Sequence, residues 1–229
     1  MTRRAGKMNP PPTSMIMPPH AFSLACRACP RLSDFLEAVR SEHPDYHAKP
    51  VAPFGDARPR LLIVGLAPGK HGANRTGRPF TGDHAGILLY ETLHEFGFAS
   101  APASRSADDG LTLKGVRVTN AVKCLPPQNK PDRAEIRRCN AYLRQELEAL
   151  APGAVVLALG QIAHQAVLLA LGAKPGDFRF SHGARHTAAR GLTLYDSYHC
   201  SRYNTQTRRL TPEMFKAVFA AIASELRGR

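Results

Sequence analysis

Short apolar segments alternate with longer amphipathic segments along the chain. The apolar segments are rich in Val, Ile and Leu, as strands buried on both faces are, and span 60–66, 116–119, 154–159 and 192–196. The amphipathic segments repeat apolar residues at helical spacing and span 84–98, 132–150, 161–171 and 211–226. This alternation predicts an α/β fold, a three-layer α/β/α sandwich with a central four-stranded parallel sheet.

Two of the predicted helices carry clear start signals. Thr211 followed by Pro212 is typical of an N-cap with proline at the first helical position. Asp132 with Glu135 three residues later resembles a capping box. In open α/β sheets, ligands bind at the carboxyl ends of the strands. The loops after Leu66, Thr119 and Tyr198 are therefore the places to look for chemistry.

Length and composition favour one folded domain with a tail. A chain of 229 residues with 43% apolar composition can bury one sizeable core. Residues 1–20 are basic and interrupted by Pro10, Pro11, Pro12, Pro18 and Pro19. We expect a disordered Pro-rich tail at 1–20, rather than a signal peptide, and a single domain at 21–229.

The charge balance indicates a polyanionic partner. The chain carries 31 Lys and Arg against 18 Asp and Glu, a formal charge of +13, most of it outside the tail. Basic charge can also serve solubility alone, so charge by itself leaves both interpretations open. No apolar run approaches the roughly 20 residues that cross a bilayer, so no membrane association is expected. We expect a monomer in a reducing cytoplasm.

The loop after the first predicted strand is rich in glycine. It runs from Gly65 to Asp83 with five glycines and leads into a helix, so its backbone can approach a ligand closely. A nucleotide-binding loop is the obvious competitor. It needs four residues between its first glycine and the Gly-Lys pair, whereas three separate Gly65 from Gly69, and His71 stands where Ser or Thr would bind magnesium.

Five cysteines, an odd number, argue against a disulfide framework. Cys26 and Cys29 form C-x-x-C ahead of a helix, while Cys124 lies in the second loop and Cys139 in the next helix. Four such thiols fit either a cubane iron–sulfur cluster or zinc, and the spacing favours neither. Cys200 is left over as a free thiol.

Three motifs together resemble one family. They are G-L-A-P-G-x-H-G-x-N-R-T-G-R-P-F-T-G-D from residue 65, N-A-V-K-C-x-P-P-x-N-K-P from residue 120, and H-x-S-x-x-N-T-Q-T-x-R-L-T from residue 199. They look like the three signature regions of the family-5 (type B) uracil-DNA glycosylases, and the resemblance covers about 24–226. It implies a monofunctional glycosylase that flips uracil out of DNA, hydrolyses its N-glycosidic bond and leaves an abasic site.

The resemblance also implies a base pocket. Gly65, Leu66 and Ala67 would contribute backbone, and Phe80 would stack on the flipped base, although a phenylalanine there could equally be core packing. Asn120 offers one donor and one acceptor to the pyrimidine edge. Whether hypoxanthine, xanthine or ethenocytosine are also removed is left open by the sequence.

The catalytic residues implied by the family are His199, Asp83 and Asn129. His199 would donate a hydrogen bond to uracil O2 as negative charge grows on the leaving base. Sister families keep a polar or acidic residue just after the first glycine of the first motif, but here that residue is Leu66. Asp83 would therefore stabilise the sugar cation or orient water, and Asn129 would position water. Asp83 could also simply cap the next helix.

The resemblance assigns the remaining sites as well. Contacts to uracil-containing DNA are expected from Arg75, Arg78, Arg202, Asn204 and Arg209. Family positions matching Cys26, Cys29, Cys124 and Cys139 hold a [4Fe–4S] cluster. The rival interpretation is a noncatalytic iron–sulfur or zinc DNA-binding module, which would share the basic body and the four cysteines but would not need the catalytic side chains.

Overall fold

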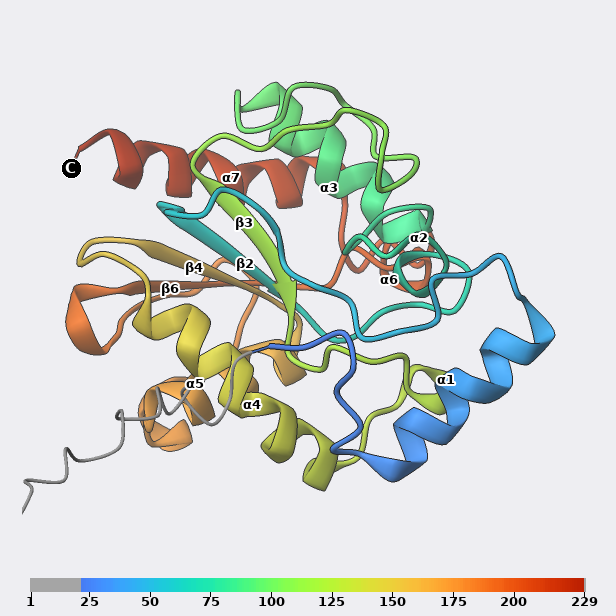
Figure 1. Ribbon diagram of the computed structural model, residues 1–229. Coiled ribbons are helices and arrows are strands. Elements are labelled where there is room, and N and C mark those ends of the chain that lie inside the picture. Colours follow the sequence, from blue (N-terminus) through green and yellow to red (C-terminus); the bar gives the residue numbers. More distant parts are fainter. Residues whose placement is uncertain (1–21, 229) are drawn as a thin grey trace, which may run out of the picture.

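The structure is a computed structural model that describes residues 22–228. The predicted tail at 1–20 lies outside these residues. A sheet in the order β1-β3-β2-β4-β6-β5 forms the centre of the molecule (Figure 1). Its four inner strands run parallel and are β2 (Leu61–Gly65), β3 (Val116–Asn120), β4 (Val155–Leu159) and β6 (Thr193–Ser197). Each lies within one residue of a predicted strand, which confirms the α/β fold.

The sheet has six strands rather than the four predicted. The two additional strands, β1 (Phe54–Gly55) and β5 (Arg185–Thr187), pair antiparallel at its two edges. They are two and three residues long and partly or fully exposed, so they carry no run of buried apolar residues. Hydrophobic patterning cannot detect such edge strands, because nothing in them needs to be buried on both faces.

Helices cover both faces of the sheet (Figure 1). Two lie on one face, α3 (His84–Glu95) and α7 (Pro212–Arg227), and two lie on the other, α4 (Arg133–Glu148) and α5 (Gln161–Leu171). Alternate residues of β2 divide between the two cores: Leu61 and Ile63 pack on the first side, and Leu62 and Val64 on the second. Each fully buried side chain of this size stabilises the fold by about 1.5–3 kcal/mol.

The predicted helix starts are confirmed. Asp132 and Glu135 form a reciprocal capping box at the start of α4. Thr211 caps α7 by accepting a hydrogen bond from the backbone N–H of Met214. Within residues 22–228, no helix combines the length and apolarity needed to cross a membrane.

Loops at the carboxyl ends of the parallel strands carry the three motifs. Short helices interrupt two of them, α2 (Ala73–Thr76) in the first and α6 (Arg202–Gln206) in the third, and both lie near the same end of the sheet (Figure 1). The second loop contains a 3₁₀ turn, η1 (Pro127–Asn129). Helix α1 (Pro30–Glu42) begins directly after Cys29, and two further 3₁₀ turns are η2 (Pro175–Asp177) and η3 (Ala189–Gly191). The fold therefore gathers the motifs at the carboxyl end of the parallel strands.

Candidate active site

Phe80 and His199 come together from the first and third loops. Their rings are nearly parallel, with centroids 5.8 Å apart and an interplanar angle of 25°. Phe80 is buried and adopts a left-handed backbone conformation, with φ of 54°, which is unusual for a bulky side chain. The two rings form one apolar wall at the end of the sheet.

Asn120 and Phe80 both lie against Gly65. A Cβ atom added to Gly65 would lie 2.5 Å from both Asn120 Oδ1 and Phe80 Cζ. Only glycine therefore fits between these two side chains. Asn120 is buried, and within the described residues its side-chain amide makes no hydrogen bond. A buried amide without a protein partner is available to a ligand.

The first two loops are joined by their backbones. The N–H groups of Ala121 and Val122 donate to the carbonyls of Gly65 and Leu66, at 2.9 and 3.0 Å. This extends the pairing of β2 and β3 beyond the strands. Leu66 and Ala67 are half-buried and contribute backbone and apolar surface, but no proton-transfer group.

His199 carries a buried nitrogen without a partner. Its Nδ1 is buried and makes no hydrogen bond among the described residues, although the residue as a whole is only half-buried. Burial lowers the pKa of His199 to about 4, so the imidazole is neutral at physiological pH. Its carbonyl accepts a hydrogen bond from Asn204 Nδ2 at 2.8 Å, which fixes the loop around it.

Asp83 is the N-cap of α3 and also faces the glycine-rich loop. One carboxylate oxygen accepts a hydrogen bond from the backbone N–H of Gly86 at 2.9 Å. The other oxygen lies against Gly72, where an added Cβ would come within 2.6 Å of it. Burial raises the pKa of Asp83, and the N–H groups at the start of α3 offset part of this effect. Its charge in turn raises the pKa of Cys200, after burial itself, which makes Asp83 a neighbour of the third loop.

Asn129 shares no hydrogen bond with these groups within the described residues. It is exposed at the end of η1, with φ of 56°. A role for Asn129 in placing water therefore remains a prediction.

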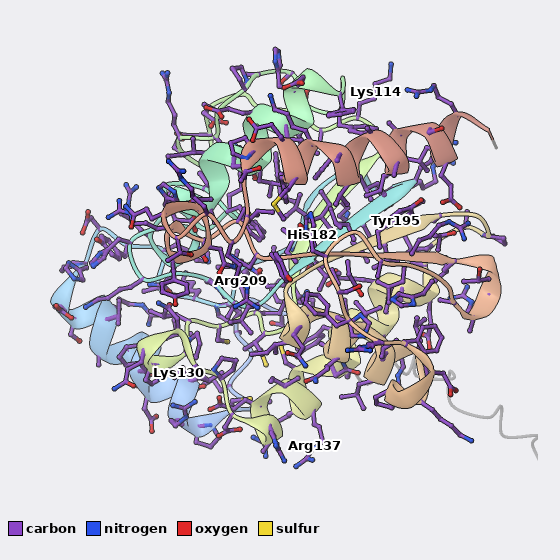
Figure 2. The ribbon with its side chains drawn as sticks, turned by 180° about the vertical axis from the view of Figure 1, so that it is seen from behind. Lys114, Lys130, Arg137, His182, Tyr195 and Arg209 are labelled. Carbon is purple, nitrogen blue, oxygen red and sulfur yellow. The ribbon has the colours of Figure 1, made fainter. Side chains whose placement is uncertain are left out.

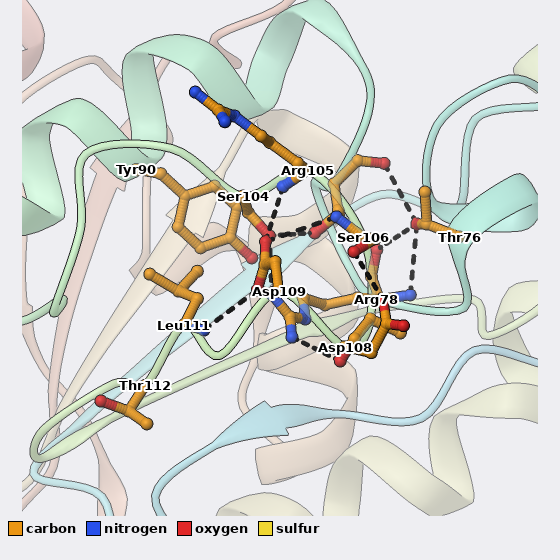
Figure 3. A network of polar contacts seen from close by, with 12 residues as sticks. Thr76, Arg78, Tyr90, Ser104, Arg105, Ser106, Asp108, Asp109, Leu111 and Thr112 are labelled. Atoms are coloured by element: carbon orange, nitrogen blue, oxygen red, sulfur yellow. Dashed lines mark hydrogen bonds and ion pairs between the residues drawn. The ribbon is translucent and has the colours of Figure 1, made fainter.

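Arg78 is not a surface arginine, which corrects the expectation that it contacts phosphate. Its guanidinium is 5% exposed, pairs with Asp109 at 2.6 Å and packs over the Phe54 ring at 4.2 Å (Figure 3). Its guanidinium donates hydrogen bonds to Asp109, Ser104 and Ala107, so the arginine anchors the first loop to a distant segment. Sequence could not show this, since the partner is 31 positions away.

The other expected DNA contacts divide into two kinds. Arg75, Arg202 and Arg209 are exposed and remain candidates for phosphate contacts. The Arg209 guanidinium lies 4.8 Å from the centroid of the Tyr198 ring, which also contacts the rings of His182 and Phe180. Figure 2 labels Arg209 and His182. Asn204 uses its amide internally, on the carbonyl of His199, so its first role is to shape the loop.

His182 was not identified from sequence. Its Nδ1 lies 3.2 Å from the backbone N–H of Tyr198, and its ring stacks on the Tyr198 ring with centroids 5.1 Å apart. It thereby supports the residue next to His199. No motif pointed to it, because it lies outside the three signature regions in a polar loop.

Four cysteines gather around one cavity on the far side of the second loop. Cys26, Cys29, Cys124 and Cys139 all line a cavity of about 280 Å³, together with Tyr142, whose hydroxyl donates to Cys26 Sγ at 3.2 Å. The backbone N–H of Lys123 donates to Cys139 Sγ at 3.3 Å. Cys200 is buried elsewhere, in the core beneath α3 and α7.

The spacing of these sulfur atoms tests which group fits. The sulfurs of a tetrahedral zinc site lie about 3.8 Å apart, because each Zn–S bond is about 2.3 Å long. Within residues 22–228, one group of three metal-ligating side chains has all its ligand atoms within 4.8 Å of one another. It consists of His164, His186 and Asp196, and it includes no cysteine. Any three of the four cysteine sulfurs therefore include a pair more than 4.8 Å apart, which is wider than the sulfur spacing of a tetrahedral zinc site.

A buried ion pair supports the strand that leads to His199. His164 Nδ1 lies 2.8 Å from Asp196 Oδ1, while its Nε2 lies 3.0 Å from the carbonyl of Phe178. Both ring nitrogens thus face acceptors. Burial lowers the pKa of His164, but the hydrogen bond and charge of Asp196 outweigh this, so that the net pKa is raised above 6.5.

This pair predicts a pH-dependent stability. Because the pKa of His164 is higher in the folded protein, its contribution to the free energy of unfolding is fully present below about pH 6.5 and is lost as the pH rises through the folded pKa. In urea unfolding between about pH 6 and 9, the stability difference between wild type and His164→Gln should shrink as the pH rises. His94→Gln, at an exposed histidine, is the control. A constant difference would show that His164 is neutral when folded.

Known proteins resemble this chain over most of its length. A sequence model of the Uracil DNA glycosylase superfamily matches residues 52–223. The chain belongs to the uracil-DNA glycosylase superfamily. Within it, the chain is similar to type-5 uracil-DNA glycosylases: it is 49% identical to that of Thermus thermophilus over 201 residues, which cover 85% of this chain and 90% of the relative.

Further relatives agree. The type-5 uracil-DNA glycosylase of Pyrobaculum aerophilum is 45% identical, with 87% of this chain and 88% of the relative covered. The type-4 uracil-DNA glycosylase of Saccharolobus solfataricus is only 27% identical, with 75% of each covered. The family predicted from the three motifs is thus confirmed.

Proposed function

We propose that the protein is a monofunctional uracil-DNA glycosylase, a DNA-repair hydrolase that flips uracil from DNA and cleaves its N-glycosidic bond. The observation that carries this function is that Phe80 lies with Asn120 against Gly65 and stacks with His199, which offers one stacking surface and two polar side chains to a single planar base. The names of the type-5 relatives support the same conclusion.

Recognition of the base rests on stacking and edge hydrogen bonds. The Phe80 ring presents an apolar surface, and the free Asn120 amide can accept from uracil N3–H through its oxygen and donate to O4 through its nitrogen. Gly65 keeps the space between these side chains open. Backbone at Leu66 and Ala67 completes the pocket.

Catalysis rests mainly on stabilising the leaving group. As the glycosidic bond breaks, the sugar becomes oxocarbenium-like and negative charge spreads over the uracil. A neutral His199 can donate a hydrogen bond to uracil O2 without first gaining a proton, in keeping with its lowered pKa. Asp83 offers a carboxylate beside the glycine-rich loop, where it can stabilise the sugar cation or orient water.

Strand cleavage is not part of this function. It would need an amine free to attack the sugar, yet the lysines of the first two motif loops that lie nearest the strands are engaged: Lys123 with Glu146 and Thr119, and Lys70 with Glu42. The chain is therefore expected to leave an intact strand carrying an abasic site.

A [4Fe–4S] cluster held by Cys26, Cys29, Cys124 and Cys139 is the proposed cofactor. The four thiols line one cavity, and any three of their sulfurs include a pair more than 4.8 Å apart, which supports a group larger than a single zinc ion. Such a cluster would supply a structural cross-link between the N-terminal segment, the second loop and α4. Because Asn120 and Asn129 flank Cys124 in the chain, this link would steady the second loop.

DNA binding is expected to fall steeply with salt, because Lys and Arg release counterions from the phosphates they neutralise. Arg202→Ala should weaken binding to all duplex sequences and reduce the slope of log K against log salt by about 1. Lys114→Ala removes the same charge just before β3, at the amino-terminal end of the parallel strands, and should leave the slope unchanged (Figure 2). Fluorescence anisotropy over a salt series measures both. Equal effects of the two variants would contradict a binding face at the motif loops.

Release of free uracil from a uracil-containing duplex tests the function directly. The proposed glycosylase liberates the base, whereas a noncatalytic DNA-binding module would bind the duplex and release nothing. The same assay on duplexes with hypoxanthine, xanthine or ethenocytosine defines how broad the specificity is. The protein is expected to act as a monomer.

A further inference from the structure

A segment outside the three motifs holds both neighbours of Phe80. Residues 104–109 lie in the connection between α3 and β3, and they contact Arg78 and Thr81, which flank Phe80 at a distance of two residues and one residue (Figure 3). No motif includes this segment. Its contacts nevertheless converge on the ring that forms one wall of the base pocket.

Arg78 provides the first attachment. One guanidinium nitrogen, Nη1, donates to Asp109 Oδ1 at 2.6 Å and to Ser104 Oγ at 3.0 Å, and Nη2 donates to the carbonyl of Ala107 at 2.6 Å. With the side chain 5% exposed, this arginine has little access to water. A buried guanidinium needs such partners, because an unpaired buried charge is strongly destabilising.

Asp109 is the charged centre of this attachment. Besides Arg78, it accepts hydrogen bonds from the backbone N–H groups of Arg105 at 2.7 Å and Leu111 at 3.0 Å. Burial raises its pKa, but these donors outweigh burial and hold the pKa of Asp109 below its ordinary value. The carboxylate is thus ionised, and both of its oxygens accept hydrogen bonds.

The second attachment lies on the other side of Phe80. Thr81 Oγ1 and Ser104 Oγ are 2.7 Å apart, within hydrogen-bonding distance. The buried hydroxyl of Tyr90 donates to the carbonyl of Pro79 at 2.8 Å. The backbone on both sides of Phe80 is therefore fixed by side chains that do not touch the pocket.

Phe80 needs this support because its backbone is strained. A left-handed conformation is costly for a bulky residue and persists only where the surroundings impose it. Gly86 leaves room for the displaced carbonyl of Phe80, since an added Cβ would lie 1.9 Å from that oxygen. Released from its anchors, the segment would relax, and the ring would leave its place beside Gly65 and His199.

We propose that Asp109 is a positioning residue for base recognition, which acts through Arg78 to hold the Phe80 ring where the flipped base stacks. This inference rests on the proposed glycosylase function. Asp109 does not touch the base; it sets the geometry of the side chain that does.

The test is a double-mutant cycle between Asp109→Asn and Phe80→Ala, read as the single-turnover excision rate at saturating enzyme. Both carboxylate oxygens of Asp109 accept hydrogen bonds from N–H groups. In Asp109→Asn one of them becomes an NH₂ group, which cannot accept, so the attachment of Arg78 is weakened with little change in side-chain volume. Asp109→Asn should slow excision by roughly 10-fold or more, as misplacement of a binding group by about 1 Å does. In the Phe80→Ala background it should cause no further loss. The matched control is Asp108→Asn, since the exposed Asp108 accepts from Ser106 Oγ and forms no ion pair with Arg78 among the described residues.

Equal losses from Asp109→Asn in both backgrounds, or no loss in either, would overturn the proposal. Should Asp109→Asn fail to fold, Ser104→Ala removes one contact to Arg78 and the contact to Thr81, and the same cycle applies. A readout independent of activity separates this inference from the function: with Phe80→4-fluorophenylalanine, the ¹⁹F resonance should shift on Asp109→Asn and stay in place on Asp108→Asn. A wild type that releases no uracil refutes the proposed function, whereas an unmoved ¹⁹F resonance refutes the positioning role.

Discussion

Replacing His199 by alanine should lower the single-turnover rate of uracil excision by about 10²–10³, the usual loss when one donor to a developing anion is removed. DNA binding should survive much better than turnover, because the hydrogen bond to uracil O2 strengthens mainly as charge develops. The ring's buried Nδ1 has no hydrogen-bond partner within residues 22–228, so this nitrogen makes no structural hydrogen bond there. The loss should therefore be catalytic rather than structural.

The excision rates of three further variants show how large the His199→Ala effect is. Asp83→Ala and Asn129→Ala should each lower the rate less than His199→Ala. Leu66 stands where sister families keep a water-activating side chain, so we expect catalysis to depend more on stabilising the leaving group than on activating water. His94→Ala, at an exposed histidine near the end of α3, should keep the wild-type rate. A full rate in His199→Ala would contradict the assignment. If Asp83→Ala alone abolished activity in a folded protein, the principal role would pass to Asp83.

Replacing Cys139 by serine should abolish the cluster. Purified wild type is expected to be brown and to contain about four irons per chain, with one cysteine for each iron. Cys139→Ser should lose the colour and the iron, and its melting temperature should fall, because metal binding contributes directly to the free energy of folding. Metal analysis and thermal unfolding of the same preparations measure both effects.

Cys200→Ala is the matched control for the cluster. Cys200 is buried like Cys139, and more completely, but it lies in the core beneath α3 and α7, away from the cavity that the other four thiols line. Its replacement should leave iron and colour unchanged. One equivalent of zinc without iron in the wild type, or unchanged iron in Cys139→Ser, would contradict the cluster assignment.

The central strands were predictable from sequence because burial on both faces forces an apolar run. Every residue of β2 and β4 is buried, and both runs stand out as Val, Ile and Leu in the sequence. Strand β5, Arg185–Thr187, is polar and lies at an edge, so nothing in its sequence distinguishes it from a loop. Helix caps were predictable for a similar reason, since Asp132, Thr211 and Asp83 act on residues next to them.

The motifs supplied the candidate site residues, and the roles of these residues remain predictions. Phe80 lies with Asn120 against Gly65 and stacks with His199, whereas Arg78, in the same motif as Phe80, points inward. The difference depends on Asp109, a partner far along the chain in a segment that could not be placed in space from sequence alone. Local patterns report which residues are available for chemistry, but long-range contacts decide which of them face the substrate.

The central claim is tested most directly by a product balance on a duplex with one uracil. Incubated with excess wild-type protein, the duplex should yield one free uracil and one abasic site per molecule, and the uracil strand should remain uncut until it is treated with alkali. Tight binding of the duplex without release of uracil would contradict the account.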